Sequence, residues 1–313
     1  MASSSDFEHW LLTAATPSVR HTTLRRLLDR PEADPEVQRA RAEMRTQGPI
    51  PAILADQTAE GNWRGARAYY TPKYTGTHWS LLLLAELEAD PADQRLARGA
   101  DFMLKATERD LERGQGRGRG GISCFWGNLL RYSLHAGLAE DRRLQPVVHY
   151  LVHDALAGDW RCGYAEGLPC AWGAARGLWG LAALPGPLRS PEVEQAIAQG
   201  LAFLLERHHL ADADYPAADE AGPLWFRLNF PLFYQADILF VLRVLEELGA
   251  LAHPGAQPAL AWLAGKRLAN GRWHGASPLR RWTYAALGGR EETDRWVSMQ
   301  SAILLRQAST TTR

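Results

Sequence analysis

The stretch Gln57–Leu87, QTAEGNWRGARAYYTPKYTGTHWSLLLLAEL, decides how the rest of the chain is expected to fold. It begins with Gln-x-x-x-Gly-x-Trp (Gln57, Gly61 and Trp63), passes through a loop rich in Tyr and Pro, and becomes almost wholly apolar after Thr77. Because glycine adopts the positive φ that ends a helix, Gly61 predicts a helix end, and Trp63 can then pack over the next helix. The stretch predicts a turn anchored by an aromatic ring, followed by a buried helix.

The same unit recurs along the chain at intervals of about 50 residues. Asp-Pro or Ser-Pro pairs, which suit the start of a helix, stand at 34–35, 90–91 and 190–191. Gly-x-Trp returns at 158–160 and 271–273, each time after an amphipathic segment. The apolar segments that predict inner helices are 77–88, 123–138, 170–184, 231–248 and 296–307. The amphipathic segments that predict outer helices are 35–55, 91–106, 142–155, 191–207 and 256–269, and shorter helices are expected at 7–13 and 18–30.

These segments predict an all-α protein built from stacked helical hairpins, each of which buries its apolar face against a neighbour. Counting the N-terminal segments, about six inner helices match five to six outer ones, which is enough to close a ring. Linker-like composition is confined to 113–121 and 211–222, both within the periodic pattern. We therefore expect one domain over residues 1–313.

Composition narrows the class of protein. Lys and Arg (35) balance Asp and Glu (35), so no net charge favours a nucleic-acid partner. The first residues, MASSSDFEHW, lack the basic and apolar regions of a signal peptide, and no apolar run reaches the roughly 18 residues of a membrane span. Three cysteines in 313 residues do not indicate a disulfide framework. We expect a soluble cytoplasmic protein with no transmembrane segment and no nucleic-acid partner.

The complete Gln-x-x-x-Gly-x-Trp at Gln57–Trp63, its shorter copies and the alternating helices resemble the terpenoid cyclase and protein prenyltransferase superfamily, which includes squalene–hopene cyclases and prenyltransferase β-subunits. The resemblance implies an α/α toroid with a central cavity and an isoprenoid ligand. Two family motifs are incomplete here. The nearest match to the Asp-x-Asp-Asp acid motif of class II cyclases is Asp212–Tyr215, which lacks the last Asp. The zinc set of prenyltransferases is matched by Asp159 and Cys162, but Val297 stands where a His is expected.

The cysteines are candidates for a separate metal site. Cys124-Phe-Trp-Gly and Cys170-Ala-Trp-Gly repeat one pattern at the starts of neighbouring inner helices, and Cys162 precedes the second copy. Thiolates at similar heights suit zinc, so Cys124, Cys162 and Cys170 predict at most one bound zinc ion. No Cys-x-x-Cys pair is present, and free cysteines in apolar helices also serve as small buried hydrophobes.

Positive charge is expected near the mouth of the cavity. The run Arg113–Gly121 places arginines and glycines just before an inner helix, where backbone N–H groups and guanidinium groups suit a diphosphate. Its spacing matches no phosphate-binding loop and fits an exposed loop equally well. Arg131 and Arg176, on inner helices, are expected to bind substrate unless they pair with carboxylates.

Two residues are candidates for proton transfer. Asp237 interrupts the apolar segment NFPLFYQADILFVLRVL, where a carboxyl group must be hydrogen-bonded or functional. Facing a cavity, it would act as a general acid or base, whereas a structural role would tie it to an arginine or a helix end. His78, at the start of the first apolar helix, is a second candidate, and its alternative is a hydrogen-bonded core histidine.

Aromatic residues gather at the starts of the inner helices and in the loops that lead to them, in a chain with 12 Trp. If they line a cavity, they suit an isoprenoid chain and cationic intermediates; if the centre is filled, they are core. The predicted substrate-binding rings are Tyr74, Trp79, Trp126, Trp172, Trp225, Phe230, Tyr234 and Trp296.

Three functional hypotheses follow from these patterns. The leading one is a toroid that binds an apolar or isoprenoid small molecule, as a cyclase-like or prenyl-transferring enzyme without the usual acid motif. The second is a non-catalytic binding or scaffold toroid. The third is a carbohydrate-active toroid, which needs two carboxylates facing each other across a cleft.

Overall fold

The computed structural model describes residues 4–64, 69–114, 121–158, 160–165, 167–207, 210 and 223–311. Over these ranges the chain forms helices and isolated β-bridges, with no β-strand. The prediction of an all-α protein is therefore confirmed. The acid-motif match Asp212–Tyr215, the zinc candidate Asp159 and most of the run Arg113–Gly121 lie outside the described residues.

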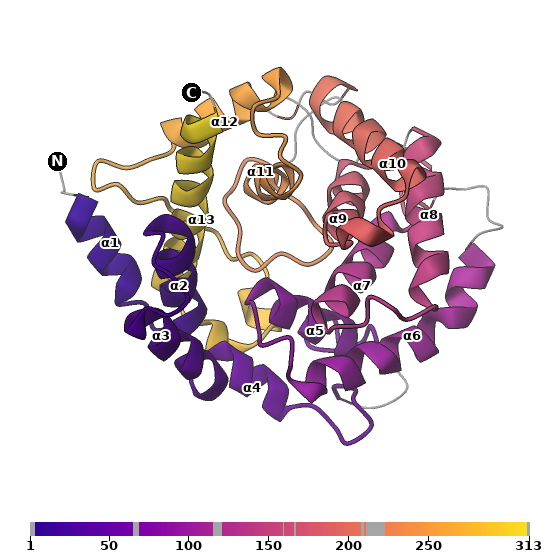
Figure 1. The fold of residues 1–313 in the computed structure, drawn as a ribbon, viewed down its shortest axis with the longest axis horizontal. Coiled ribbons are helices and arrows are strands. Elements are labelled where there is room, and N and C mark those ends of the chain that lie inside the picture. Colours follow the sequence, from indigo (N-terminus) through magenta and orange to yellow (C-terminus); the bar gives the residue numbers. More distant parts are fainter. Residues whose placement is uncertain are drawn as a thin grey trace.

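The helices lie in an outer and an inner layer (Figure 1). The outer helices are α1 (Ser4–Leu12), α3 (Pro35–Thr46), α4 (Pro49–Ala55), α6 (Gln94–Gly114), α8 (Leu144–Leu156), α10 (Pro191–Ala202) and α12 (Gln257–Gly265). The inner helices are α2 (Pro17–Thr22), α5 (Thr77–Glu86), α7 (Ser123–His135), α9 (Ala171–Ala182), α11 (Ile238–Glu247) and α13 (Arg290–Thr311). Every residue of α5 is buried, as the apolar sequence of this segment predicts.

Successive inner helices are neighbours in space. Contacts join α5 to α7, α7 to α9, α9 to α11, α11 to α13 and α13 to α2. From α2, the Ser18 hydroxyl donates to the Leu87 carbonyl (2.8 Å), just beyond the end of α5. These contacts, followed from α5 through the inner helices in order, therefore return to the end of α5. The more specific expectation, an α/α toroid with about six inner and five to six outer helices, stays a prediction.

Two predicted helices have other bounds in the structure. The outer helix expected over 35–55 is divided into α3 and α4, because Gly48 has a positive φ of 74° and is followed by Pro49. The inner helix expected over 231–248 begins only at Ile238. Residues 223–237, which we call the 223–237 segment, are irregular; Phe230 N–H donates to the Ala276 carbonyl (2.9 Å).

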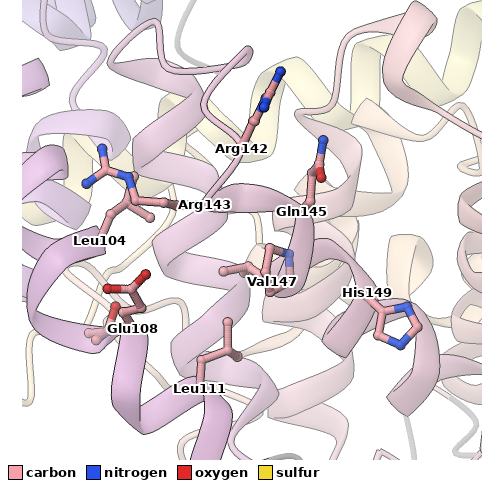
Figure 2. Close-up of a pocket in the computed structure, with 10 residues that line it drawn as sticks. Leu104, Glu108, Leu111, Arg142, Arg143, Gln145, Val147 and His149 are labelled. Atoms are coloured by element: carbon pink, nitrogen blue, oxygen red, sulfur yellow. The ribbon is translucent and has the colours of Figure 1, made fainter.

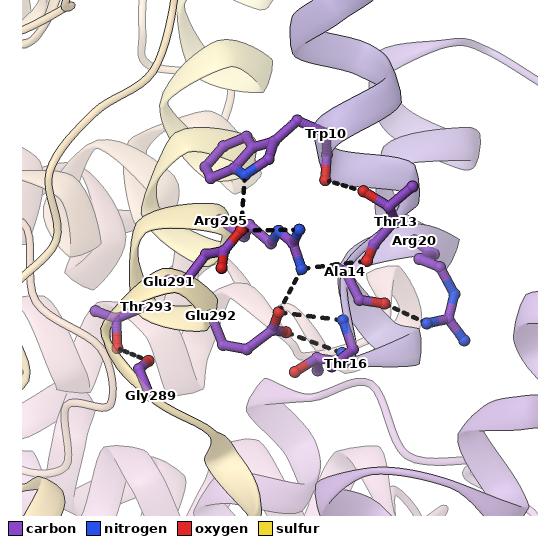
Figure 3. A network of polar contacts seen from close by, with 11 residues as sticks. Trp10, Thr13, Ala14, Thr16, Arg20, Gly289, Glu291, Glu292, Thr293 and Arg295 are labelled. Carbon is purple, nitrogen blue, oxygen red and sulfur yellow. Dashed lines mark hydrogen bonds and ion pairs between the residues drawn. The ribbon is translucent and has the colours of Figure 1, made fainter.

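The first and last helices are joined by side chains of α13, a region that we call the seam (Figure 3). The Glu292 carboxylate accepts hydrogen bonds from the backbone N–H groups of Ala15 (3.1 Å) and Thr16 (2.9 Å), at the start of α2. Arg295 donates to the Thr13 carbonyl (3.1 Å) and forms an ion pair with Glu292 (2.7 Å). The seam consists of Trp10, Thr13, Ala15, Thr16, Glu291, Glu292 and Arg295.

Two of the three Gly-x-Trp turns, at Trp63 and Trp273, link the end of an outer helix to the following inner helix by hydrogen bonds of the tryptophan. The Trp63 indole donates to Ile53 in α4 (2.7 Å), while its backbone N–H donates to Thr77 of α5 (3.0 Å). Trp273 repeats this arrangement between Leu263 of α12 (2.8 Å) and Ser298 of α13 (2.8 Å). The glycines at 61, 158 and 271 all have positive φ, as the motif predicts. These tryptophans therefore fix the spacing of the two layers.

The closest approach in the inner layer is between α7 and α9. A Cβ atom on Gly127 would lie 2.1 Å from the Arg176 carbonyl oxygen, and one on Gly180 would lie 2.5 Å from the Gly127 carbonyl oxygen. Real Cβ atoms do not come this close to backbone, so both positions require glycine. The glycine of the Cys-x-Trp-Gly pattern at 124–127 is therefore explained by helix packing.

Candidate functional site

Aromatic side chains from α5, α7, α9, the loop before α5 and the 223–237 segment converge near the N-terminal ends of these three helices. Trp79 contacts Tyr74 and Tyr234, with ring centroids 5.6 and 6.2 Å apart, and Tyr234 contacts Trp172 at 6.1 Å. We call the connected set the aromatic cluster, which comprises Tyr69, Tyr70, Tyr74, His78, Trp79, Phe125, Trp126, Trp172, Phe233 and Tyr234. The structure thus brings five of the eight rings predicted to bind substrate into one group.

Lys73 lies at the solvent side of the aromatic cluster. Its ammonium nitrogen is 4.6 Å from the centroid of the Tyr234 ring and 5.6 Å from that of Tyr74. Tyr70 is 37% exposed, so one edge of the cluster reaches water. Ring faces in this cluster therefore already hold a cation, the interaction that a cationic ligand group would use.

Four other residues predicted to bind substrate make contacts of their own. Phe230 and Trp296 form a stacked pair, with centroids 4.1 Å apart. The Trp225 indole is buried and donates to the Leu210 carbonyl (2.9 Å). Arg131 forms an ion pair with Glu247, the last residue of α11, and lies over the Trp179 ring. Arg131 is thus held at the C-terminal end of α11 by an ion pair with a carboxylate. This ion pair was the alternative to substrate binding for Arg131.

Asp237 caps a helix. Its Oδ1 accepts from the Phe240 backbone N–H (2.8 Å), and its Oδ2 accepts from the Asn229 backbone N–H (2.7 Å) and side-chain amide (2.8 Å). The expectation that Asp237 lies within a helix is wrong, because α11 begins at the next residue. Burial raises the pKa of Asp237 to about 6, against the lowering effect of the hydrogen bonds from Phe240 and Asn229. Its carboxyl oxygens are engaged in holding the start of α11.

His78 is fully buried within the aromatic cluster. Its ring stacks on Phe125 at 4.4 Å, and Nδ1 lies 3.2 Å from the Tyr132 hydroxyl. Burial, together with the charge of Arg176, lowers the pKa of His78 to about 3. The imidazole is therefore neutral at physiological pH and is not present as an imidazolium that could act as a general acid.

Arg176, expected at the cavity mouth, is instead completely buried in the inner layer. Its Nε and Nη2 both donate to the Gln235 carbonyl (2.9 and 2.7 Å), and its guanidinium carbon lies 3.7 Å from the Phe240 ring centroid. Burial lowers the pKa of Arg176 to about 9, so the group stays charged at neutral pH. Arg176 therefore anchors the 223–237 segment to α9.

Asn128 and Gln235 are two further polar residues of this region, and no sequence motif predicts a role for either of them. Asn128 lies on α7 one turn after Cys124, and its amide donates to the Phe233 carbonyl (3.0 Å). With Arg176, it holds the 223–237 segment from two neighbouring helices. The sequence signal was an uncharged polar residue within a mainly apolar segment. Such residues are too common to predict a site.

The three cysteines do not share one structural role. The Cys170 sulfur caps α9 by accepting from the Gly173 backbone N–H (2.9 Å), whereas Cys124 lies inside the first turn of α7. Burial and the neighbouring Cys162 raise the pKa of the Cys124 thiol to about 12. Among the described residues, no group of three or more His, Cys, Asp or Glu side chains is arranged to hold a metal ion. The zinc site stays a prediction, and the described geometry gives it no support.

A pocket of about 520 Å³ lies in the outer layer, between α6 and α8 (Figure 2). Leu104, Leu111 and Val147 supply its apolar lining, and Glu108 and His149 lie at its polar edges. None of the residues predicted to bind substrate lines it. We therefore place the candidate site at the aromatic cluster.

Comparison of the chain with known protein families, with characterised proteins and with solved structures finds no match. Fold and site must therefore be interpreted from this structure. In the part of the chain that the structure describes, helices that are both long and apolar enough to span a membrane do not occur.

Proposed function

We propose that this protein is an α/α toroid whose inner wall binds an isoprenoid-like apolar molecule. The sequence of contacts through the inner layer supports the ring. The observation that carries the binding function is the aromatic cluster, which reaches solvent at Tyr70 and holds the Lys73 ammonium over the Tyr234 ring. Apolar pockets with aromatic walls bind isoprenoid chains by burial of apolar surface, and ring faces add attraction for positive charge.

The described contacts support binding better than acid-initiated cyclisation. Asp237 uses both oxygens to hold α11 and Asn229, and His78 is neutral and hydrogen-bonded. A carbohydrate-active toroid needs a second carboxylate opposite a free first one, and Asp237 is not free. The proposal therefore contains no proton-transfer step.

A scaffold toroid without a small-molecule ligand is the second candidate. It is favoured by the complete burial of Trp79 and Trp126, which already pack against other rings of the aromatic cluster. The two candidates differ in whether the half-buried Trp172 and Tyr234 also contact a ligand.

Binding can be tested with native mass spectrometry of the purified protein, followed by tryptophan-fluorescence titration with farnesol and squalene. We expect at least one of them to bind, and Trp172→Ala to weaken binding by about tenfold, the cost of one aromatic contact. The matched control is Trp262→Ala, a half-buried tryptophan on outer helix α12. Absence of binding to either probe, with no apolar molecule retained on purification, would favour the scaffold.

A further inference from the structure

Four buried polar atoms next to the aromatic cluster lack a hydrogen-bond partner among the described residues. They are His78 Nε2, Asn128 Oδ1, Arg176 Nη1 and Gln235 Oε1. We call these four residues the polar layer. They come from α5, α7, α9 and the 223–237 segment, so four separate parts of the chain contribute one atom each. Leaving a buried polar atom unpaired costs about 1 to 3 kcal/mol, so four in one region call for a ligand or bound water.

The polar layer lies directly behind the aromatic cluster. His78 belongs to both and stacks on Phe125. Gln235 follows Tyr234, and its side chain acts to lower the pKa of Tyr74, which places it beside that ring. The charge of Arg176 acts on His78, which places the two side chains in one neighbourhood. A chain bound along the aromatic rings would therefore end at the polar layer.

For Asn128 and Arg176, the hydrogen bonds that the side chain already makes show whether its unpaired atom is a donor or an acceptor. The Asn128 amide donates to the Phe233 carbonyl, which leaves its Oδ1 as an acceptor. Arg176 uses Nε and Nη2 on the Gln235 carbonyl, which leaves Nη1 as a donor. Together with Gln235 Oε1, the polar layer offers at least one donor and two acceptors.

Charge in this region is balanced. Arg243 forms an ion pair with Glu86, and the field at Arg176 includes both Glu86 and Asp237. Two guanidinium groups thus face two carboxyl groups, and a diphosphate would add negative charge beside the acceptor oxygens of Asn128 and Gln235. A neutral group that donates and accepts at once, such as a hydroxyl, matches the polar layer instead.

We propose that the polar layer binds the hydroxyl end of an isoprenoid alcohol, so that the preferred ligand is a neutral prenyl alcohol and not a prenyl diphosphate. This inference rests on the proposed function, since the hydrocarbon part of the ligand is held by the aromatic cluster. It keeps the expectation that Arg176 binds substrate, but through a neutral hydroxyl. The Arg176 donor and the Asn128 and Gln235 acceptors share the hydroxyl.

The test compares three probes of equal chain length: farnesol, farnesyl diphosphate and farnesene, which lacks the oxygen. Calorimetric or fluorescence titration of the full chain should give an affinity for farnesol at least about tenfold above that for either of the others, the value of one to two well-placed hydrogen bonds. Equal affinity for farnesol and farnesene, or a preference for the diphosphate, overturns the inference and leaves the proposed function standing. Failure of all three probes and of squalene to bind, with no apolar molecule retained on purification, removes the proposed function itself.

Gln235→Met makes the test specific to the polar layer. The substitution removes Oε1 and keeps the backbone carbonyl on which Arg176 depends. We expect the ratio of farnesol to farnesene affinity to fall by about tenfold while farnesene affinity is retained. Gln257→Met, at the start of outer helix α12, is the control and should leave the ratio unchanged. An unchanged ratio in Gln235→Met also overturns the inference, and the wild-type comparison decides the question if this variant does not fold.

Discussion

Glu292 and Asp237 both hold helix starts, and they lie in opposite electrostatic settings. Glu292, at the seam, accepts from Ala15 and Thr16 and pairs with Arg295 near the surface. Asp237, in the inner layer, accepts from Asn229 and Phe240 and is completely buried. Burial opposes ionisation of Glu292, but bonds from Thr16, Ala15 and Arg295 outweigh it and lower the pKa. For Asp237 burial outweighs the bonds, and the pKa rises to about 6.

The comparison distinguishes polar groups whose hydrogen bonds hold two parts of the chain together from polar groups that also keep an unpaired atom for a ligand. At the seam, both oxygens of Glu292 are used, and Arg295 directs both terminal nitrogens to the seam. In the inner layer, Arg176 and Asn128 anchor the 223–237 segment and each keep one buried atom unpaired. The seam leaves one buried atom, Arg295 Nε, without a partner among the described residues, whereas the polar layer has four such atoms.

The largest expected effect comes from Gly127→Ala, which changes the inner layer and leaves the seam intact. The new Cβ would meet the Arg176 carbonyl oxygen at 2.1 Å, so α7 and α9 must separate. We expect a loss of at least about 3 kcal/mol in the free energy of unfolding, measured by urea denaturation. Gly265→Ala, where a Cβ meets nothing within 4 Å, is the control and should be neutral or slightly stabilising. Similar values for both variants would show that α7 and α9 are not tightly packed.

Asp237→Asn tests the electrostatics of the inner layer through pH. Because the folded pKa of Asp237 is raised, its contribution to stability is present at low pH and is lost as the pH rises through about 6. The stability advantage of the wild type over Asp237→Asn should therefore fall by about 2 to 3 kcal/mol between pH 3.5 and pH 7. Asp141→Asn is the control with the opposite sign, because a hydrogen bond from Arg143 lowers the pKa of Asp141. A pH-independent difference for Asp237→Asn would mean that its hydrogen bonds cancel the effect of burial.

Glu292→Gln is expected to have the smallest of the three effects, a loss of about 2 kcal/mol near neutral pH, because the amide cannot accept at both positions. The lowered pKa of Glu292 means that its contribution is present above the unfolded pKa and is lost as the pH falls below about 4. Denaturation at pH 7 and pH 3 should show the difference from wild type shrinking with acid. Glu291→Gln, with a side chain 66% exposed, should change stability by less than about 1 kcal/mol. A loss from Glu291→Gln as large as that from Glu292→Gln would contradict the assignment of the seam to Glu292.

The sequence predicted well those features that depend on residues close together in the chain, such as turns and helix caps. Gly61 and Gly271 have the positive φ that their turns require, and Trp63 and Trp273 link two layers as the motif indicates. Asp34 caps α3 through the Glu36 backbone N–H (2.8 Å), as Asp-Pro predicts. The aromatic cluster was predicted in part, because inner-helix starts converge in any layered arrangement of hairpins.

The inner layer was less predictable because its roles depend on contacts distant in sequence. An apolar run such as residues 230–248 indicates burial but does not distinguish a buried irregular segment from a helix, so Asp237 was placed inside α11. Arg176 was expected to face a ligand, since nothing in its own helix reveals the Gln235 carbonyl 59 residues away. Asn128 and Gln235 acquire meaning only when α7, α9 and the 223–237 segment are in place.

The glycine contact between α7 and α9 also limits how the inner layer can move. Backbone lies against backbone at Gly127 and Gly180, so no side chain can swing aside to open a passage there. We therefore expect α7 and α9 to move together as one rigid unit. The 223–237 segment is tied to these two helices through Asn128 and Arg176, so any displacement of the segment must break the hydrogen bonds of both side chains.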